Sequence, residues 1–147
     1  MKLTKNFSLE ELMFSITACN QGWDNTPNAD ALANLKRLAV EVLQPIRDAW
    51  GKPIRVTSGY RSPRLNAAKG GVKNSQHLIG QAADIQATAF ADNVKLFRCI
   101  ERLVKSGKIK CGQIIWEYGT RANPKWVHVS LPRQGKKNNQ FVYYYSK

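Results

Sequence analysis

Apolar residues between positions 32 and 46 recur every three or four residues, which is the spacing of one buried helical face. Pro45 lies inside this pattern and has no backbone N–H to donate. We therefore expect the main core helix either to kink near residues 41–44 or to break there and resume through Trp50. The apolar positions are Leu32, Leu35, Ala39, Val42, Leu43 and Ile46.

Two further helices are predicted from their ends. Ser8 and Glu11 resemble a capping box, in which a serine hydroxyl and a glutamate carboxylate accept from each other's free backbone N–H groups, so a short helix should follow through about Phe14. Residues 93–105 show helical spacing again, and Gly107 favours a helix end just beyond them. The apolar face of that helix consists of Val94, Phe97, Ile100, Leu103 and Val104.

The middle of the chain has the texture of strands and turns. Residues 54–57 are rich in β-branched side chains and follow Gly51 and Pro53, which favours a strand there. Residues 62–71 are turn-like and basic, and residues 81–86 fit a returning strand.

Three later runs, 113–117, 126–131 and 141–145, also read as strands. The connections between them are short, so we expect these three strands to be antiparallel. Helices in the first half and strands mainly in the second predict an α+β fold.

Composition sets the scale of this picture. A chain of 147 residues with 43% apolar and 22% charged residues has the size and balance of one globular domain, so we expect a single domain over residues 1–147. No run approaches the roughly 20 apolar residues of a membrane span, and charges come too early in the N-terminus for a signal peptide. We expect a monomer made in the cytoplasm without a signal peptide.

The net charge of the chain indicates which kind of partner it would bind. With 23 Lys+Arg against 10 Asp+Glu, the formal net charge of +13 predicts attraction to a polyanion, either nucleic acid or the anionic polymers of a bacterial wall. No zinc finger or RNA-binding signature is present, which makes nucleic acid the less favoured partner. Three widely spaced cysteines, Cys19, Cys99 and Cys111, argue against a disulfide framework and favour buried thiols.

The chain contains two histidines, and each lies in a distinctive context. His77 belongs to SQHLIGQAAD, which has the form SxHxxGxAxD and ends at Asp84. His128 belongs to WVHVS, where strand alternation would put Trp126, His128 and Ser130 on one face. A lone histidine is usually an ordinary surface or core residue, but two such contexts favour a functional role.

Two histidines and one aspartate suit a catalytic zinc site. Neutral imidazole and carboxylate oxygen are normal zinc ligands, and such a site uses three protein ligands while water takes the fourth position. His77, Asp84 and His128 fit that count. Gly80 would let the backbone turn tightly between the first two ligands.

These motifs resemble those of a known family, the bacterial and phage D-alanyl-D-alanine carboxypeptidases and endolysin peptidases of the VanY type, which share a zinc fold with the hedgehog signalling domain. The segment SGYRS, from Ser58 to Ser62, is a third element in the expected order, and the match spans roughly residues 54–131. The resemblance implies one zinc ion on His77, Asp84 and His128. It also implies a small antiparallel sheet that carries the zinc site and packs against N-terminal and middle helices.

A zinc hydrolase needs a general base, which is usually a carboxylate. Some relatives place a glutamate three residues before the last histidine ligand, where this chain has Lys125. Among the acidic residues after Asp84, Asp92 opens a predicted helix and Glu101 lies on its polar side, whereas Glu117 ends a strand expected beside that of His128. Glu117 is therefore the candidate base, and an exposed glutamate at a strand end is the alternative.

The resemblance also implies substrate contacts. Arg61 resembles the arginine that steadies the substrate carbonyl as it gains negative charge, a task suited to a guanidinium with paired donors. Ser75 is similar to a substrate-binding serine, although its hydroxyl would also serve as a turn cap. Tyr60 and Trp126 are candidates to line the cleft, with a core position as the alternative.

The activity implied is zinc-dependent hydrolysis of an amide bond in the stem or cross-link peptides of peptidoglycan. D-Ala-D-Ala carboxypeptidases and murein endopeptidases use the same metal core, so the choice of bond stays open. The resemblance suggests a phage or prophage lysis protein that acts on the cell wall after release through the membrane. Two alternatives are a hedgehog-like zinc-stabilised binding module without peptidase activity and a basic nucleic-acid-binding protein.

Overall fold

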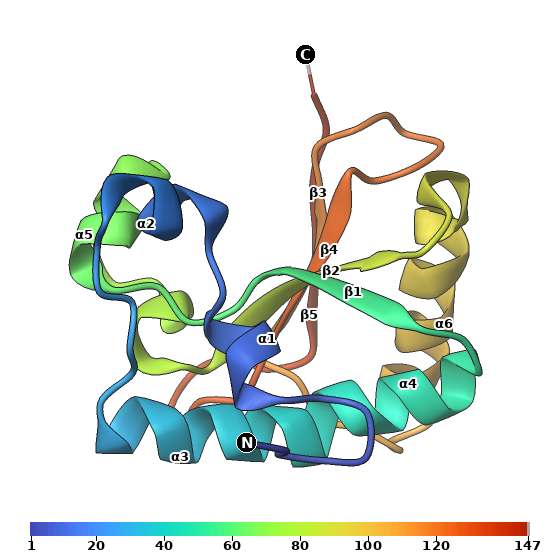
Figure 1. Cartoon of the computed structure of the whole chain (residues 1–147). Coiled ribbons are helices and arrows are strands. Elements are labelled where there is room, and N and C mark those ends of the chain that lie inside the picture. The colour runs from blue at the N-terminus through green and yellow to red at the C-terminus, as the bar shows by residue number, and fades with distance from the viewer. Residues whose placement is uncertain (147) are drawn as a thin grey trace.

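A five-stranded sheet organises the molecule, with the strand order β1-β2-β4-β3-β5. Residues 1–146 are described by a computed structural model, shown in Figure 1. All neighbouring strands are antiparallel except β3 and β5, which are parallel. The sheet and its helices confirm the α+β class. The strands are β1 (Ile54–Ser58), β2 (Ala82–Ala87), β3 (Gln113–Glu117), β4 (Trp126–Ser130) and β5 (Gln140–Tyr144).

The antiparallel pairing of β3 with β4 confirms the expectation for two of the three C-terminal strands, but the parallel pairing of β5 with β3 shows that it was wrong for the third. The chain leaves β4, passes the beginning of β3 and joins the far edge of that strand. Two backbone contacts mark the passage, since Asn139 N donates to Cys111 O at 2.7 Å and Gln140 N donates to Gly112 O at 3.0 Å. Because the short connection after β4 passes the beginning of β3, β5 pairs with β3 rather than with β4, and that pair is parallel.

The helices are distributed on both sides of the sheet in the view of Figure 1, with α6 at the right and α2 and α5 at the left. Within residues 1–146, no helix combines the length and the apolar character needed to cross a membrane. The helical elements are α1 (Leu9–Met13), α2 (Ile16–Gln21), α3 (Ala29–Leu38), η1 (Ala39–Leu43), α4 (Gln44–Trp50), α5 (Pro63–Ala68), η2 (Gln76–Ile79), η3 (Phe90–Asp92) and α6 (Asn93–Lys105).

Pro45 is accommodated by a π-helical turn. Helix α3 continues into η1, which is π-helical, and then into α4, where Pro45 lies in the first turn. The backbone N–H of Gln44 donates to the carbonyl of Ala39, five residues earlier, so the wider turn absorbs the residue that lacks a donor. The predicted irregularity at 41–44 is confirmed in position. Leu32 is only partly buried, and Ala31, Leu35 and Leu38 form the buried face of α3.

Two short helices were not predicted. Helix α1 has the expected capping box, but α2 follows it directly, and α5 lies where a basic turn was expected. The Ser62 hydroxyl accepts from the backbone N–H of Leu65 at 3.2 Å, and Pro63 occupies the first turn, where its missing N–H is harmless. The Leu65 side chain of this helix is buried.

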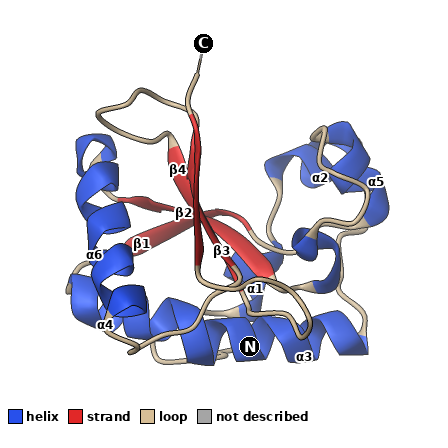
Figure 2. Cartoon of the chain, turned by 180° about the vertical axis from the view of Figure 1, so that it is seen from behind, coloured by secondary structure: helices blue, strands red, loops and turns tan. Residues whose placement is uncertain are grey.

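One face of the sheet forms the core with α3, η1, α4 and α6. Side chains alternate along each strand, so the residues between these core positions lie on the opposite face, which is more polar. Figure 2 shows the helices around the strands from behind. The core residues from the sheet are Ile54, Ala83, Ile85, Ala87, Ile114, Trp116, Val127 and Val129.

The cysteines are all free, as expected. Cys99 and Cys111 are buried, whereas the prediction of a buried thiol was wrong for Cys19, which is exposed on the short helix α2. Burial raises the pKa of Cys111 to about 12.

Gly80 ends η2 in a conformation that favours glycine. Its φ is 76°, and a Cβ atom there would lie 2.4 Å from the carbonyl oxygen of Ala31. We expect Gly80→Ala to lower the free energy of unfolding by about 2–4 kcal/mol, because alanine would incur both a left-handed backbone and a clash with main chain. Urea unfolding measures the loss.

The matched control for that substitution is Gly51→Ala. Gly51 has a φ of 77°, and a Cβ there would meet nothing within 4 Å, so only the backbone cost of about 1 kcal/mol should remain. Equal losses in the two variants would contradict a role for the close approach of Gly80 to helix α3.

Candidate metal centre

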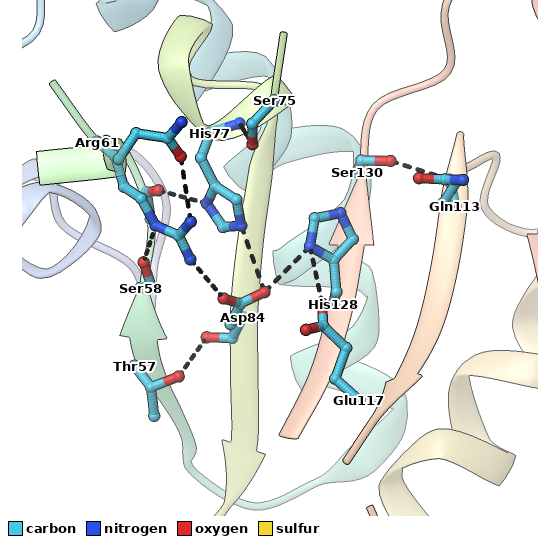
Figure 3. Close-up of polar contacts among 12 residues, drawn as sticks. Thr57, Ser58, Arg61, Ser75, His77, Asp84, Gln113, Glu117, His128 and Ser130 are labelled. Carbon is cyan, nitrogen blue, oxygen red and sulfur yellow. Dashed lines mark hydrogen bonds and ion pairs between the residues drawn. The ribbon is translucent and has the colours of Figure 1, made fainter. Parts of the chain in front are cut away.

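The register of the sheet brings the candidate ligands together. Asp84 on β2 and His128 on β4 are directly opposite cross-strand partners, and both lie on the face away from the core. His77 comes from η2, just before β2, and its side chain reaches over the same face (Figure 3). Figure 3 shows the Asp84 carboxylate between the two imidazole rings.

The spacing of these donor atoms fits a metal ion. His77 Nε2 lies 3.4 Å and His128 Nδ1 lies 3.0 Å from Asp84 Oδ1. Ligands at the usual zinc distances, placed at tetrahedral corners, are separated by about 3.3 Å. One ligand atom from each of the three residues lies within 4.8 Å of the others, and all three residues are buried. Two imidazole nitrogens and a carboxylate oxygen therefore form a donor set of the zinc type.

His77 is held in the orientation that a ligand needs. Its Nδ1–H donates to the carbonyl oxygen of Gly59 at 2.7 Å, which leaves Nε2 as the ring nitrogen that faces Asp84 and is available to a metal ion. Gly59 itself passes close to α1, since a Cβ there would lie 2.1 Å from the carbonyl oxygen of Leu12. The orientation of the ring thus depends on packing between the N-terminal helix and the segment after β1.

Asp84 remains ionised in this environment. Burial alone would raise its pKa, but the charges of His77 and His128 and their hydrogen bonds outweigh burial and hold the pKa well below its usual range. The Arg61 guanidinium also lies beside it, with Nη2 3.2 Å from Asp84 Oδ2. The deprotonated form that a metal ligand requires is therefore favoured.

Arg61 is positioned by three side chains. Its Nε donates to the Ser58 hydroxyl at 2.9 Å, Nη1 donates to Asn66 Oδ1 at 3.3 Å, and Nη2 donates to Asp84. A guanidinium has five N–H groups, so two donors remain for another molecule. Asn66, which lies on α5 and also donates to the Val72 carbonyl, was missed by sequence reasoning because nothing local marks it as a partner of Arg61.

Glu117 ends β3 on the same face of the sheet. Its Oε1 lies 3.7 Å from His128 Nδ1, near the donor cluster but outside it. Burial, followed by the negative charge of Asp84, raises the pKa of Glu117. The two other acidic candidates are occupied elsewhere, because Asp92 precedes α6 and Glu101 forms ion pairs along that helix.

Two clefts flank the donor cluster. The first, here called the histidine cleft, has a volume of about 390 Å³ and is lined by residues that include His77, His128, Ser75 and Arg133. The second, here called the tryptophan cleft, has a volume of about 420 Å³, and its lining includes Asp84, Lys69, Lys125 and Trp126. Arg61, Gly70, Gly71, Glu117 and Tyr118 line both clefts, so the two meet at the donor cluster.

Of the three residues predicted to contact substrate, two line a cleft and one does not. Ser75 lines the histidine cleft, and its hydroxyl also accepts from the backbone N–H of His77 at 3.1 Å. Trp126 lines the tryptophan cleft, as expected. Tyr60 does not line either cleft but belongs to the hydrophobic core, because its backbone N–H is tied to the Leu12 carbonyl of α1. The prediction that Tyr60 lines the cleft was therefore wrong, and the alternative of a core position holds.

Several cleft residues were not anticipated. Tyr118 follows β3 with a φ of 59°, a rare conformation for a residue with a side chain, and its ring packs edge-on against Trp126 with centroids 5.2 Å apart. Arg133 and Tyr144 come from the connection after β4 and from β5, whose place in the sheet was predicted incorrectly. Only the final topology brings them to the site.

Comparisons with known proteins agree with this geometry. The zinc D-Ala-D-Ala carboxypeptidase of Streptomyces albus G is 39% identical to this chain over 84 residues, which are 56% of the chain and 31% of that protein. The chain thus spans less than a third of the length of this relative. Residues 5–130, which hold all three donor residues, match the family described as peptidase M15, and the chain belongs to the peptidase M15 family.

Proposed function

We propose that this protein is a zinc-dependent peptidase that hydrolyses amide bonds in the peptides of bacterial peptidoglycan. His77 Nε2, Asp84 Oδ1 and His128 Nδ1 would hold one zinc ion per chain. The observation that carries the proposal is the buried donor cluster at the meeting point of two open clefts, with a carboxylate and a guanidinium beside it. The name of the similar carboxypeptidase supports the substrate class.

Zinc, when bound at such a site, polarises the scissile carbonyl and lowers the pKa of the attacking water. Glu117 then takes the proton from that water and passes it to the leaving amine. The rise in its pKa, caused first by burial, makes the carboxylate a better proton acceptor than an exposed glutamate. The cleft-lining position of its carboxylate leaves it accessible to substrate.

Arg61 would steady the negative charge that develops on the scissile carbonyl oxygen. Three of its donors are already committed, so the group is oriented before substrate arrives, and two donors remain on a residue that lines both clefts. Ser75 and Trp126 would contact the peptide on opposite sides of the reacting bond, one in each cleft.

A peptidase explains these features better than a zinc-stabilised binding module does. A structural zinc site needs neither a carboxylate with a raised pKa nor an arginine with unused donors, and it is normally closed by a fourth protein ligand. The net charge of +13 would hold the enzyme on the anionic polymers of the wall. We also infer that residues 1–147 act as one domain, which the hydrophobic cluster shared by both halves supports.

The expected result with purified peptidoglycan is release of new peptide ends that depends on zinc. Mass spectrometry of the digest identifies the bond: loss of terminal D-Ala indicates a carboxypeptidase, whereas cleavage between L-Ala and D-Glu or in a cross-bridge indicates an endopeptidase. A lytic role in a phage or prophage would further require that added protein reduces the turbidity of permeabilised cells. Peptidoglycan without new peptide ends after incubation with the zinc-loaded protein would contradict the proposed function.

A further inference from the structure

The connection between β4 and β5 contributes an arginine to the histidine cleft. Arg133 lines this cleft together with both histidines of the donor cluster. It lies beyond residue 130, where the match to the peptidase M15 family ends. The family match therefore assigns no role to this residue, and its position in the cleft results from the way this chain continues after β4.

The backbone of Arg133 is fixed. Its N–H donates to Asn138 Oδ1 at 3.0 Å, and its carbonyl accepts from Asn138 Nδ2 at 3.1 Å. The base of the same connection is attached to the sheet, because Asn139 N donates to the Cys111 carbonyl and Asn139 Oδ1 accepts from Cys111 N at 2.9 Å. The loop thus presents Arg133 from a defined position at the edge of the cleft.

The guanidinium of Arg133, in contrast, has no acidic partner. Within residues 1–146, no carboxylate lies within ion-pair distance of it, and it makes no side-chain hydrogen bond in that part of the chain. The other arginine of the histidine cleft, Arg61, is already paired with Asp84. The one acidic residue among the described lining residues is Glu117, which lies beside His128. The histidine cleft therefore contains a positive charge without a protein counterion.

We propose that Arg133 binds a carboxylate of the substrate in the histidine cleft and thereby selects peptides with a free carboxylate on that side of the scissile bond. This inference rests on the proposed function. A guanidinium with its full set of donors matches a carboxylate by two parallel hydrogen bonds. In a stem peptide this chemistry has two sources, the C-terminal carboxylate and the free carboxylate of D-Glu. Tyr144, from β5, supplies a wall of the same cleft.

The test compares the binding of three synthetic stem pentapeptides to zinc-loaded protein by calorimetry. One peptide carries both carboxylates, one has a C-terminal amide, and one has the D-Glu carboxylate replaced by an amide. Glu117→Gln protein is used throughout, so that the peptide is not consumed. We expect one of the two amides to bind about tenfold more weakly than the parent peptide, which identifies the source.

Arg133→Gln should bind the parent peptide about tenfold more weakly and should lose the discrimination between acid and amide. Lys137→Gln is the matched control, because Lys137 is exposed on the same loop and carries the same charge, and it should bind like the parent protein. The inference is overturned if neither amide binds more weakly, or if Arg133→Gln and Lys137→Gln weaken binding equally. Turnover is measured separately with protein that keeps Glu117. If no turnover is found, the proposed function is rejected, whereas the role of Arg133 in carboxylate binding is still decided by the binding measurements.

Discussion

His128→Ala is expected to abolish stoichiometric zinc binding and to lower turnover of peptidoglycan peptides by at least about 1,000-fold. The substitution removes one of three donors, and the two that remain, His77 and Asp84, would form an incomplete site. Asp84 would keep its ion pair with Arg61 at 3.2 Å, so no buried charge is left without a partner. The expected loss is therefore one of metal binding rather than of folding.

Metal analysis and thermal unfolding distinguish these outcomes. The parent protein should contain about one equivalent of zinc and should unfold at a higher temperature when zinc is added, because a ligand that binds only the folded state stabilises it. His128→Ala should show neither property. Gln140→Ala, at the start of β5 and outside the lining of both clefts, should behave like the parent protein. A full equivalent of zinc in His128→Ala would contradict the assignment of the ligands.

The donor cluster could be predicted from the sequence because each ligand lies in a local pattern. Strand alternation in WVHVS places His128 on one face, and the cross-strand pairing of His128 with Asp84 then requires only that β2 and β4 be neighbours. Gly80 also had a local signal, since a tight turn between His77 and Asp84 needs a residue that tolerates positive φ. Local chemistry and a single strand pairing were sufficient for this part of the site.

The walls of the site could not be predicted in the same way, because they depend on contacts between distant segments. Asn66 reaches Arg61 only after α5 has packed against η2, and α5 is a short helix capped by Ser62. Tyr144 reaches the histidine cleft only because the connection before β5 passes the start of β3. Strand β5 then pairs with β3 in parallel. A short connection predicts a neighbouring strand but does not say which edge the chain will join.

The position of the candidate base follows from the pairing of β3 with β4. Glu117 is the cross-strand partner of Trp126, and the backbone N–H of Lys125 donates to the Glu117 carbonyl at 3.1 Å. Glu117 and Lys125 both line the tryptophan cleft. A glutamate three residues before the last histidine ligand would therefore stand at position 125, directly before β4 and beside the end of β3. A carboxylate could therefore enter the tryptophan cleft from position 117 or from position 125.

Glu117→Gln is accordingly expected to lower kcat by about 100-fold to 10,000-fold, while KM and zinc content stay close to those of the parent protein. Glutamine keeps the size of the side chain but cannot accept and return a proton. Glu101→Gln removes the same charge on α6, away from both clefts, and should leave kcat unchanged. Parent-like turnover by Glu117→Gln would exclude it as the base.

A double variant tests whether the carboxylate or the residue position matters. In Glu117→Gln/Lys125→Glu, the carboxylate moves to the residue just before β4, which lines the tryptophan cleft together with position 117. We expect turnover to recover at least about tenfold over Glu117→Gln alone, since proton transfer needs a carboxylate within reach of the attacking water rather than a particular strand. Lys125→Gln in the Glu117→Gln background is the control for loss of the lysine charge. If it recovers as much turnover as Lys125→Glu, the gain comes from removal of the lysine charge, and a carboxylate at position 125 does not replace Glu117 in proton transfer.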